Sequence, residues 1–301
     1  MEKKISPSEL ARAAELIRSG HLVAFPTETV YGLGANALDP AAIDKIYAAK
    51  GRPSNSPLIV HVSSIEMARG LVREWPEQAE RLARIFWPGP LTLVLPKQAH
   101  VPHRLTAGLD TVGVRMPAHP IAQALILEAG VPIAAPSANL FTQLSPTTAQ
   151  HVLAALGDRV AMVLDGGRTT VGIESTVLSL VGSGAVLLRP GMVTRQQIEE
   201  VIGPVQLLGP VTEGAHASPG LHHRHYSPKT PLILMEAGQA PPSGRGIVLP
   251  MPDDPRAYAS VLYERLHQAD AEGWDWIAIA QPPAGEEWSA IRDRLERAAA
   301  R

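Results

Sequence analysis

The sequence contains no cysteine. This absence excludes disulfide bonds, iron–sulfur clusters, cysteine-based zinc sites and thiol nucleophiles. The chain also lacks an apolar run of about twenty residues, so we expect no membrane span. The first ten residues, MEKKISPSEL, lack the apolar core of a signal peptide. We therefore expect a cytoplasmic protein that does not use a membrane as partner.

The chain has little net charge. It carries −2 at neutral pH over 301 residues, so any phosphate or nucleic-acid site must be a local concentration of lysine and arginine. With 45% hydrophobic and 19% charged residues, the chain can bury a core and is not disordered. The length favours two domains.

The distribution of helical and strand patterns divides the chain. Residues 1–205 mix the two patterns without a regular βαβ rhythm, which favours a mixed α/β sheet domain. Residues 206–230 are rich in glycine and proline but carry an aromatic and basic cluster, which predicts a linker with a role at a site. Residues 231–301 alternate strands with helices and predict a small Rossmann-like parallel α/β domain.

Several local patterns predict where helices begin or end and where the chain turns. Asp39 and Pro40 are typical of an N-cap and a first helical position, so a helix is expected from there to Lys50. Ser145 is most simply explained as the N-cap of a later helix. The segment around Gly32 and Gly34 is most simply a glycine turn with a threonine-rich edge, whose hydroxyls could bind a small polar ligand. A phosphate cradle is only weakly indicated, because the full dinucleotide-binding fingerprint is absent.

The segment KGRPSNSP is the first candidate for chemistry. Lys50 ends the predicted helix, where a cation stabilises the helix dipole. That interpretation does not explain why Pro53 and Pro57 stiffen the loop around Arg52. A rigid loop carrying an arginine suits a preorganised phosphate site, since arginine binds phosphate in a bidentate manner.

Polar side chains also follow or interrupt apolar strands. Arg115 lies in the strand pattern VGVRM, where it either reaches solvent or is paired in a pocket that takes a carboxylate ligand. Ser137 and Asn139 follow an apolar strand. They are either turn formers or donors at the carboxyl end of a strand, where α/β proteins commonly bind ligands.

Two other motifs give weaker evidence of a catalytic or metal site. Ser175 lacks a G-x-S-x-G elbow and a histidine fixed by motif, so a ligand-contacting hydroxyl is favoured over a nucleophile. The run HHRH, from His222 to His225, lacks helical ligand spacing and a neighbouring carboxylate, so a metal site there is disfavoured.

Taken together, these stretches resemble the threonylcarbamoyl-AMP synthases, in the long two-domain form of the YrdC-like family. The resemblance spans nearly all of residues 15–230, and the tail beyond matches more weakly. It rests on the ordered blocks PTETVYGLG, K-x-R at Lys50 and Arg52, PLIVHV, WPGPLT, TAGLDTVGVRMP, S-x-N at Ser137 and Asn139, DGG, ESTV, LRPG and PGLHHRHYSPKTP.

The resemblance implies a fold and a reaction. The fold is a YrdC-like twisted mixed-sheet domain with flanking helices, followed by the linker and the small domain. The reaction converts L-threonine, bicarbonate or CO2 and ATP to threonylcarbamoyl-AMP and pyrophosphate. A downstream threonylcarbamoyl transferase then uses the product to modify tRNA, and a weak contact with tRNA itself is implied. Mg²⁺ is expected with ATP, held mainly by the phosphates and not by protein ligands.

The resemblance also implies site residues. Lys50, Arg52, Ser137 and Asn139 form the two short signatures that are expected to act in catalysis, with the two cations facing the ATP phosphates. The expected threonine-binding set is Thr29, His61, Arg115, Ala135 and Ser175. The expected ATP-binding set is Arg52, Ser56, Thr111, Ser137, Ser145, Arg189 and Tyr226, with Tyr226 as a lid over ATP.

The sequence departs from the family pattern at a few positions. Ser56 stands where the family usually has asparagine, and Phe141 and Thr142 replace a common Ser-Gly turn. Two alternatives to a synthase remain. One is an RNA-binding or regulatory YrdC-like module without synthase activity. The other is a carbamoyl-handling maturation factor, which the missing cysteine zinc fingers disfavour.

Overall fold

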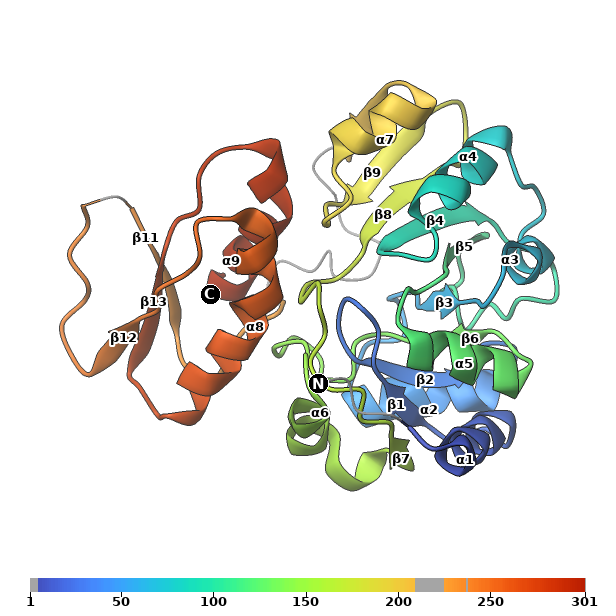
Figure 1. Ribbon diagram of the computed structural model, residues 1–301, viewed down its shortest axis with the longest axis horizontal. Helices are drawn as coiled ribbons and strands as arrows, with labels where there is room; N and C mark the ends of the chain where they lie inside the picture. The colour runs from blue at the N-terminus through green and yellow to red at the C-terminus, as the bar shows by residue number, and fades with distance from the viewer. Residues whose placement is uncertain (1–4, 209–224, 237, 301) are drawn as a thin grey trace.

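Two separate β-sheets organise the chain. The computed structural model describes residues 5–208, 225–236 and 238–300, and within them a ten-stranded mixed sheet and a three-stranded sheet lie side by side with helices between them (Figure 1). The expected fold class, a mixed-sheet α/β domain with a small parallel-sheet domain, is confirmed.

The large sheet has the strand order β10-β9-β8-β4-β5-β3-β6-β2-β1-β7 and mixes parallel with antiparallel pairs. Its strands are β1 (Val23–Phe25), β2 (Gly32–Asn36), β3 (Ile59–His61), β4 (Leu91–Pro96), β5 (Thr111–Arg115), β6 (Ile133–Ala134), β7 (Met162–Val163), β8 (Thr176–Ser179), β9 (Ala185–Arg189) and β10 (Val205–Leu207). Strands β1, β3, β4 and β8 are short and almost wholly buried, which explains why they form apolar runs without alternation.

Helices flank this sheet. They are α1 (Pro7–Arg18), α2 (Pro40–Lys50), α3 (Ile65–Leu71), α4 (Glu77–Phe86), α5 (Pro120–Ala129), α6 (Ala149–Leu156) and α7 (Arg195–Ile202). As predicted, Asp39 caps α2 by accepting a hydrogen bond from Ala41 N, and Lys50 is its last residue. Gly51 follows in the left-handed conformation, with φ of 61°, which turns the chain toward Arg52.

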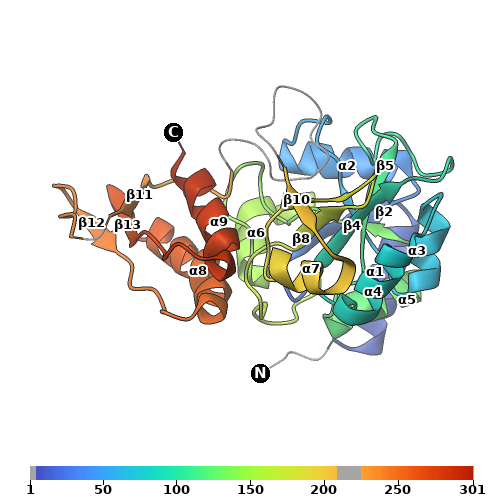
Figure 2. The same ribbon diagram turned by 90° about the horizontal axis from the view of Figure 1, so that it is seen from above.

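The second domain is built on three parallel strands in the order β11-β13-β12. The strands are β11 (Leu232–Met235), β12 (Gly246–Val248) and β13 (Trp276–Ala280). Helices α8 (Pro255–Ala271) and α9 (Ser289–Ala299) lie between this sheet and the large domain in both views (Figures 1 and 2). Their apolar faces share one core with the sheet.

The two domains are packed closely against each other. The core of the second domain includes Val30, Leu144 and Ile173 from the large domain. Gly172 lies directly against α8, where a Cβ atom would come within 2.3 Å of the Ala259 carbonyl oxygen. A glycine is required there because any side chain would separate the domains.

The structure corrects two local expectations. The glycine segment around Gly32 is a strand, β2, that pairs with β1 and β6. The N-cap of α6 is Thr148, which accepts from His151 N, and not Ser145. The Gly32 segment is a strand because it pairs with strands distant in sequence, and Ser145 donates its hydroxyl to Glu174 while the nearer Thr148 caps α6.

The predicted division at 1–205, 206–230 and 231–301 stays a prediction, because most of the proposed linker lies in residues 209–224, outside the described residues. No helix in the described part of the chain is long and apolar enough to cross a membrane.

Candidate active site

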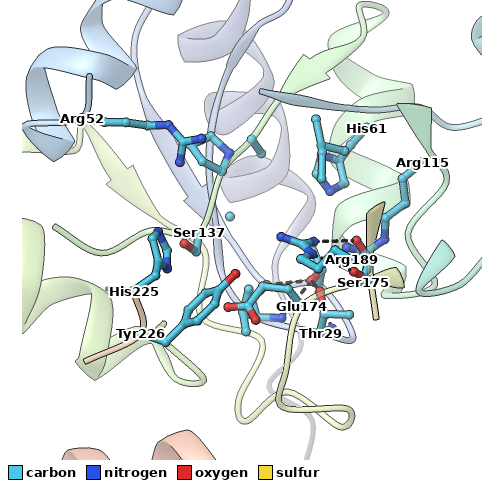
Figure 3. A pocket seen from close by; sticks show the side chains of 16 residues that line it. Thr29, Arg52, His61, Arg115, Ser137, Glu174, Ser175, Arg189, His225 and Tyr226 are labelled. Carbon is cyan, nitrogen blue, oxygen red and sulfur yellow. Dashed lines mark hydrogen bonds between the residues drawn. The ribbon is translucent and has the colours of Figure 1, made fainter. Parts of the chain in front are cut away.

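A pocket lies where several strands of the large sheet end, and residues 225–226 form part of its wall (Figure 3). His61, Arg115 and Arg189 are the last residues of β3, β5 and β9, so the sheet places all three at this pocket. Of the predicted site residues, those that line it are Thr29, Arg52, His61, Arg115, Ala135, Ser137, Ser175, Arg189 and Tyr226.

The pocket wall also contains residues that the sequence analysis did not select: Thr27, Val30, Gly32, Ile59, Pro136, Glu174 and His225. Of these, Glu174 is the one that brings a carboxylate to the wall. It immediately precedes the predicted Ser175 in the block ESTV, which carried the family resemblance without indicating a role for the acidic residue.

Arg115 is paired in a pocket and does not reach solvent. Its Nη2 donates to Glu28 Oε1 at 2.6 Å, and its Nε donates to the Gly89 carbonyl at 3.2 Å. The side chains of Arg115 and Glu28 are 5% and 8% exposed. The second oxygen of Glu28 accepts from Ala118 N. The guanidinium is thus fixed in orientation before any ligand arrives.

The hydrogen-bond partners of Ser175 among the described residues do not include a general base, which a serine nucleophile requires. Its Oγ lies 2.8 Å from Thr92 Oγ1 and accepts from Arg189 Nη2 at 3.2 Å. Arg189 Nε also donates to the Ser175 carbonyl. Since these partners are a hydroxyl and a cation, and not a general base, the arrangement suits a hydroxyl that contacts a ligand.

Arg52 enters the pocket from the loop after α2. Its Nη2 donates to Ser56 Oγ and to the Pro57 carbonyl, and its Nε has no hydrogen-bond partner among the described residues. Burial lowers the pKa of Arg52 to about 10, so the group remains cationic at neutral pH. A buried cation with an unused donor is suited to binding an anion.

Lys50 lies beside the pocket but does not line it. Its Nζ donates to the carbonyls of Ser137 and Asn139 at 2.6 and 2.5 Å, and burial holds its pKa well below the usual value. Asn139 in turn donates through Nδ2 to the Leu140 and Gln143 carbonyls. In the structure these two signature residues shape the loop that presents Ser137.

Three residues of the predicted ATP set also lie outside the pocket lining. Ser56 is buried and accepts from Arg52. Thr111 begins β5, opposite Pro96 of β4. Ser145 is fully buried and donates through Oγ to Glu174 Oε1 at 2.5 Å. Their assignment to ATP stays a prediction.

His61 is buried and neutral. Burial and the nearby Arg115 lower its pKa to about 3, and its Nδ1 has no hydrogen-bond partner among the described residues. The ring meets Phe25 edge to face, with centroids 6.1 Å apart. A neutral imidazole with an unused nitrogen can exchange a hydrogen bond with a polar substrate without adding charge.

Tyr226 approaches the pocket from the segment that precedes the second domain (Figure 3). It is fully buried, with a left-handed φ of 61°, and its ring lies 5.3 Å from the Arg294 guanidinium carbon. The neighbouring His225 ring contacts it at 4.1 Å. Burial raises the pKa of Tyr226, so the hydroxyl is protonated at neutral pH.

The described residues contain no cluster of three or more histidine, aspartate or glutamate side chains that could hold a metal ion. Part of the HHRH run, residues 222–224, lies outside the described residues. Glu174 is the one carboxylate in the described pocket lining, and it is ion-paired with Arg294 at 2.8 Å.

The fold and the pocket define a two-domain α/β protein with a buried, arginine-rich binding site that contains hydroxyl groups and no evident nucleophile. Comparison with known families makes the assignment specific. The family model of Sua5, YciO and YrdC, described as "Telomere recombination", matches residues 15–191, and the model "Threonylcarbamoyl-AMP synthase, C-terminal domain" matches residues 193–300. The chain belongs to the Sua5/YciO/YrdC family, in the form that carries the second domain.

Curated relatives and a solved structure agree. The chain is 51% identical over 238 residues to the threonylcarbamoyl-AMP synthase of Bacillus subtilis, covering 78% of this chain and 69% of the relative. It is 50% identical over 240 residues to that of Pyrococcus abyssi, covering 78% and 70%. The crystal structure of P. abyssi Sua5 in complex with L-threonine aligns with 99% of this chain and 96% of its own, at a TM-score of 0.92 and 40% identity.

Proposed function

We propose that this chain is an L-threonylcarbamoyladenylate synthase that converts L-threonine, bicarbonate or CO2 and ATP to threonylcarbamoyl-AMP and pyrophosphate. The observation that carries the proposal is that one pocket holds two separately fixed arginines, Arg52 and Arg115, each able to take a different anion. The threonine-bound relative, which aligns over nearly the whole chain, supports threonine as the amino acid.

In this proposal Arg115 binds the carboxylate of threonine. One side of its guanidinium is occupied by Glu28 and Gly89, and the remaining donors are available to the substrate. Thr29 and Ser175 contribute hydroxyl groups to the same pocket, and neutral His61 adds a ring nitrogen. These groups can orient a small hydroxy amino acid without placing a second cation beside its amine.

Arg52 and Arg189 bind the triphosphate. The threonine nitrogen adds to the carbon of CO2 and loses a proton, which gives a carbamate. A carbamate oxygen then attacks the α-phosphorus of ATP, a new O–P bond forms, and the bond to the bridging oxygen breaks with pyrophosphate as leaving group. The protein supplies orientation and positive charge, so the absence of a thiol and a catalytic triad is consistent with the reaction.

Mg²⁺ would enter with ATP, bound by its phosphates, and would neutralise their charge during the transfer. The described lining fits this arrangement, since its one carboxylate is already ion-paired. The product is a labile mixed anhydride, so we propose that a threonylcarbamoyl transferase acting on tRNA consumes it.

The product itself tests the proposal. The purified chain is incubated with ATP, Mg²⁺, L-threonine and ¹³C-bicarbonate. The products are separated and their masses are measured by mass spectrometry. A threonylcarbamoyl-AMP peak that carries the heavy carbon is the expected result. Cleavage of ATP to AMP without this product would overturn the assignment. An RNA-binding module without activity would give neither product.

A further inference from the structure

Glu174 occupies an unusual place for a carboxylate, because it faces a pocket that is proposed to bind ATP. It directly precedes Ser175 and lines the same wall. Its Oε1 accepts from Ser145 Oγ at 2.5 Å, and its Oε2 accepts from Tyr263 Oη at 3.1 Å and from Arg294 Nε at 2.8 Å. Two of these three donors come from the second domain.

Arg294 lies on α9 of the second domain and is completely buried, with its side chain 0% exposed. Besides Glu174, its guanidinium donates to the Pro190 carbonyl at 3.0 Å and to Asp293 Oδ2 at 2.6 Å. It also lies over the ring of Tyr226 at 5.3 Å. The second domain therefore inserts a cation behind the pocket wall, in contact with two residues that line the pocket.

The position of this ion pair has an electrostatic consequence. A carboxylate in a buried wall is screened weakly by solvent, so an unpaired Glu174 would repel a bound triphosphate. A buried ion pair is also weak as a source of stability, because its desolvation cost offsets most of the attraction. A stabilising role alone therefore gives little reason to place an arginine here.

We propose that Arg294 of the second domain is a positioning residue that neutralises Glu174, and thereby makes the pocket receptive to the ATP triphosphate. Glu174 then serves to hold Ser145 and the second domain, and Arg294 cancels its charge toward the substrate. This inference rests on the proposed synthase function. It assigns the second domain an electrostatic part in ATP binding.

The test asks whether removing the charge of Glu174 rescues the loss of Arg294. Arg294→Met removes the cation and leaves Glu174 charged, and we expect the KM for ATP to rise about tenfold or more, with the KM for threonine little changed. Adding Glu174→Gln removes the charge but keeps a side chain of the same shape. The double variant is expected to bring the KM for ATP back to within about threefold of the unmodified chain.

Binding is measured in parallel by calorimetry with the Mg²⁺ complex of α,β-methylene-ATP, which cannot be cleaved at the reacting bond. The control is Arg292→Gln on the same helix, whose guanidinium lies 3.8 Å from Glu296 at the surface. It should leave both KM values unchanged. A merely structural role of Arg294 would instead weaken ATP and threonine binding together.

Failure to rescue overturns the inference. If the double variant folds and still has the raised KM for ATP of Arg294→Met, then Arg294 acts through Tyr226 or directly on ATP, and not through the charge of Glu174. Should Arg294→Met not fold, the double variant alone decides between the same outcomes, since it contains no unpaired buried charge. The unmodified chain is assayed first, so that loss of the synthase function itself is seen separately.

Discussion

Arg115 Nη2 donates a 2.6 Å hydrogen bond to Glu28 Oε1, and this buried ion pair fixes the guanidinium at the end of β5. The other oxygen of Glu28 is anchored by the backbone N–H of Ala118. The proposed ligand of the threonine carboxylate is thus preorganised by a carboxylate of the protein itself, which lowers the ordering cost of binding.

This relationship predicts that stability and threonine use can be separated. Arg115→Met leaves Glu28 buried and unpaired, so we expect a loss of about 3–5 kcal/mol in the free energy of unfolding. The KM for threonine should rise about a hundredfold, because the carboxylate partner is gone, while ATP-analogue binding is largely kept. Denaturant unfolding and steady-state kinetics measure the two effects.

A second substitution provides the control. In Arg115→Met/Glu28→Gln the unpaired charge is removed, so most of the lost stability should return while the KM for threonine stays high. Recovery of threonine use in this double variant would show that Arg115 does not bind the substrate.

Substitution of Arg52 is expected to impair the use of ATP and to leave that of threonine, the opposite of substitution of Arg115. Arg52→Ala should raise the KM for ATP about ten- to hundredfold, as expected for the loss of charge-assisted hydrogen bonds to phosphate. The KM for threonine should change little. Arg104→Ala is the matched control, since Arg104 is half-exposed, pairs with Asp44 and stacks on Tyr47 away from the pocket lining. Equal loss of threonine and ATP binding in Arg52→Ala would contradict two separate anion sites.

Substitution of Lys50 is expected to destabilise the loop that presents Ser137 and thereby to weaken the use of ATP. Lys50→Met leaves the carbonyls of Ser137 and Asn139 without their ammonium donor, which should cost about 2–4 kcal/mol in the free energy of unfolding. Because Ser137 lines the pocket, kcat/KM for ATP should fall as well.

Lys45→Met is the comparison for Lys50. Lys45 also donates to a carbonyl, that of Gly20 at 2.6 Å, but it lies outside the pocket lining. This variant should keep its kcat/KM for ATP. If Lys50→Met is as stable as the unmodified chain yet inactive, Lys50 acts on the substrate directly and not through the loop.

A pair of histidines predicts sensitivity to acid where the domains meet. His151 of α6 and His267 of α8 stack with ring centroids 3.8 Å apart. Burial, together with His267, lowers the pKa of His151 to about 4, and burial lowers that of His267. Since both values lie below the unfolded value of about 6.5, the unfolded chain binds more protons in this range. Stability is therefore complete above about pH 6.5 and falls as the pH drops toward about 4.

Thermal unfolding checks this prediction at about pH 7.5 and about pH 5. His151→Asn should reduce the difference in melting temperature between the two conditions, whereas His103→Asn, at an exposed position, should not. An unchanged pH dependence in His151→Asn would show that the stacked pair does not cause it.

The sequence was sufficient for the features set by local chemistry. The cap at Asp39 and the end of α2 at Lys50 follow from short-range patterns and agree with the structure. The strand position of Arg115 indicated a pocketed ion pair or a solvent-exposed group, and the structure decided for the pocket.

What the sequence did not reveal depends on contacts between distant residues. Glu28 and Arg115 are 87 positions apart, and Glu174 and Arg294 are 120 apart. No periodicity or spacing rule connects such positions, since their proximity arises from the strand order of the sheet and from domain packing. The orientation of Lys50 toward the loop carbonyls was hidden for the same reason.

Pyrophosphate release by the purified chain is the most direct test of the synthase assignment. ATP, Mg²⁺ and bicarbonate are supplied, and each proteinogenic amino acid is added in turn. Release is expected with L-threonine alone, and it should stop when bicarbonate and CO2 are removed. Release that is independent of the amino acid, or none with threonine while the ATP analogue still binds, would contradict the synthase assignment.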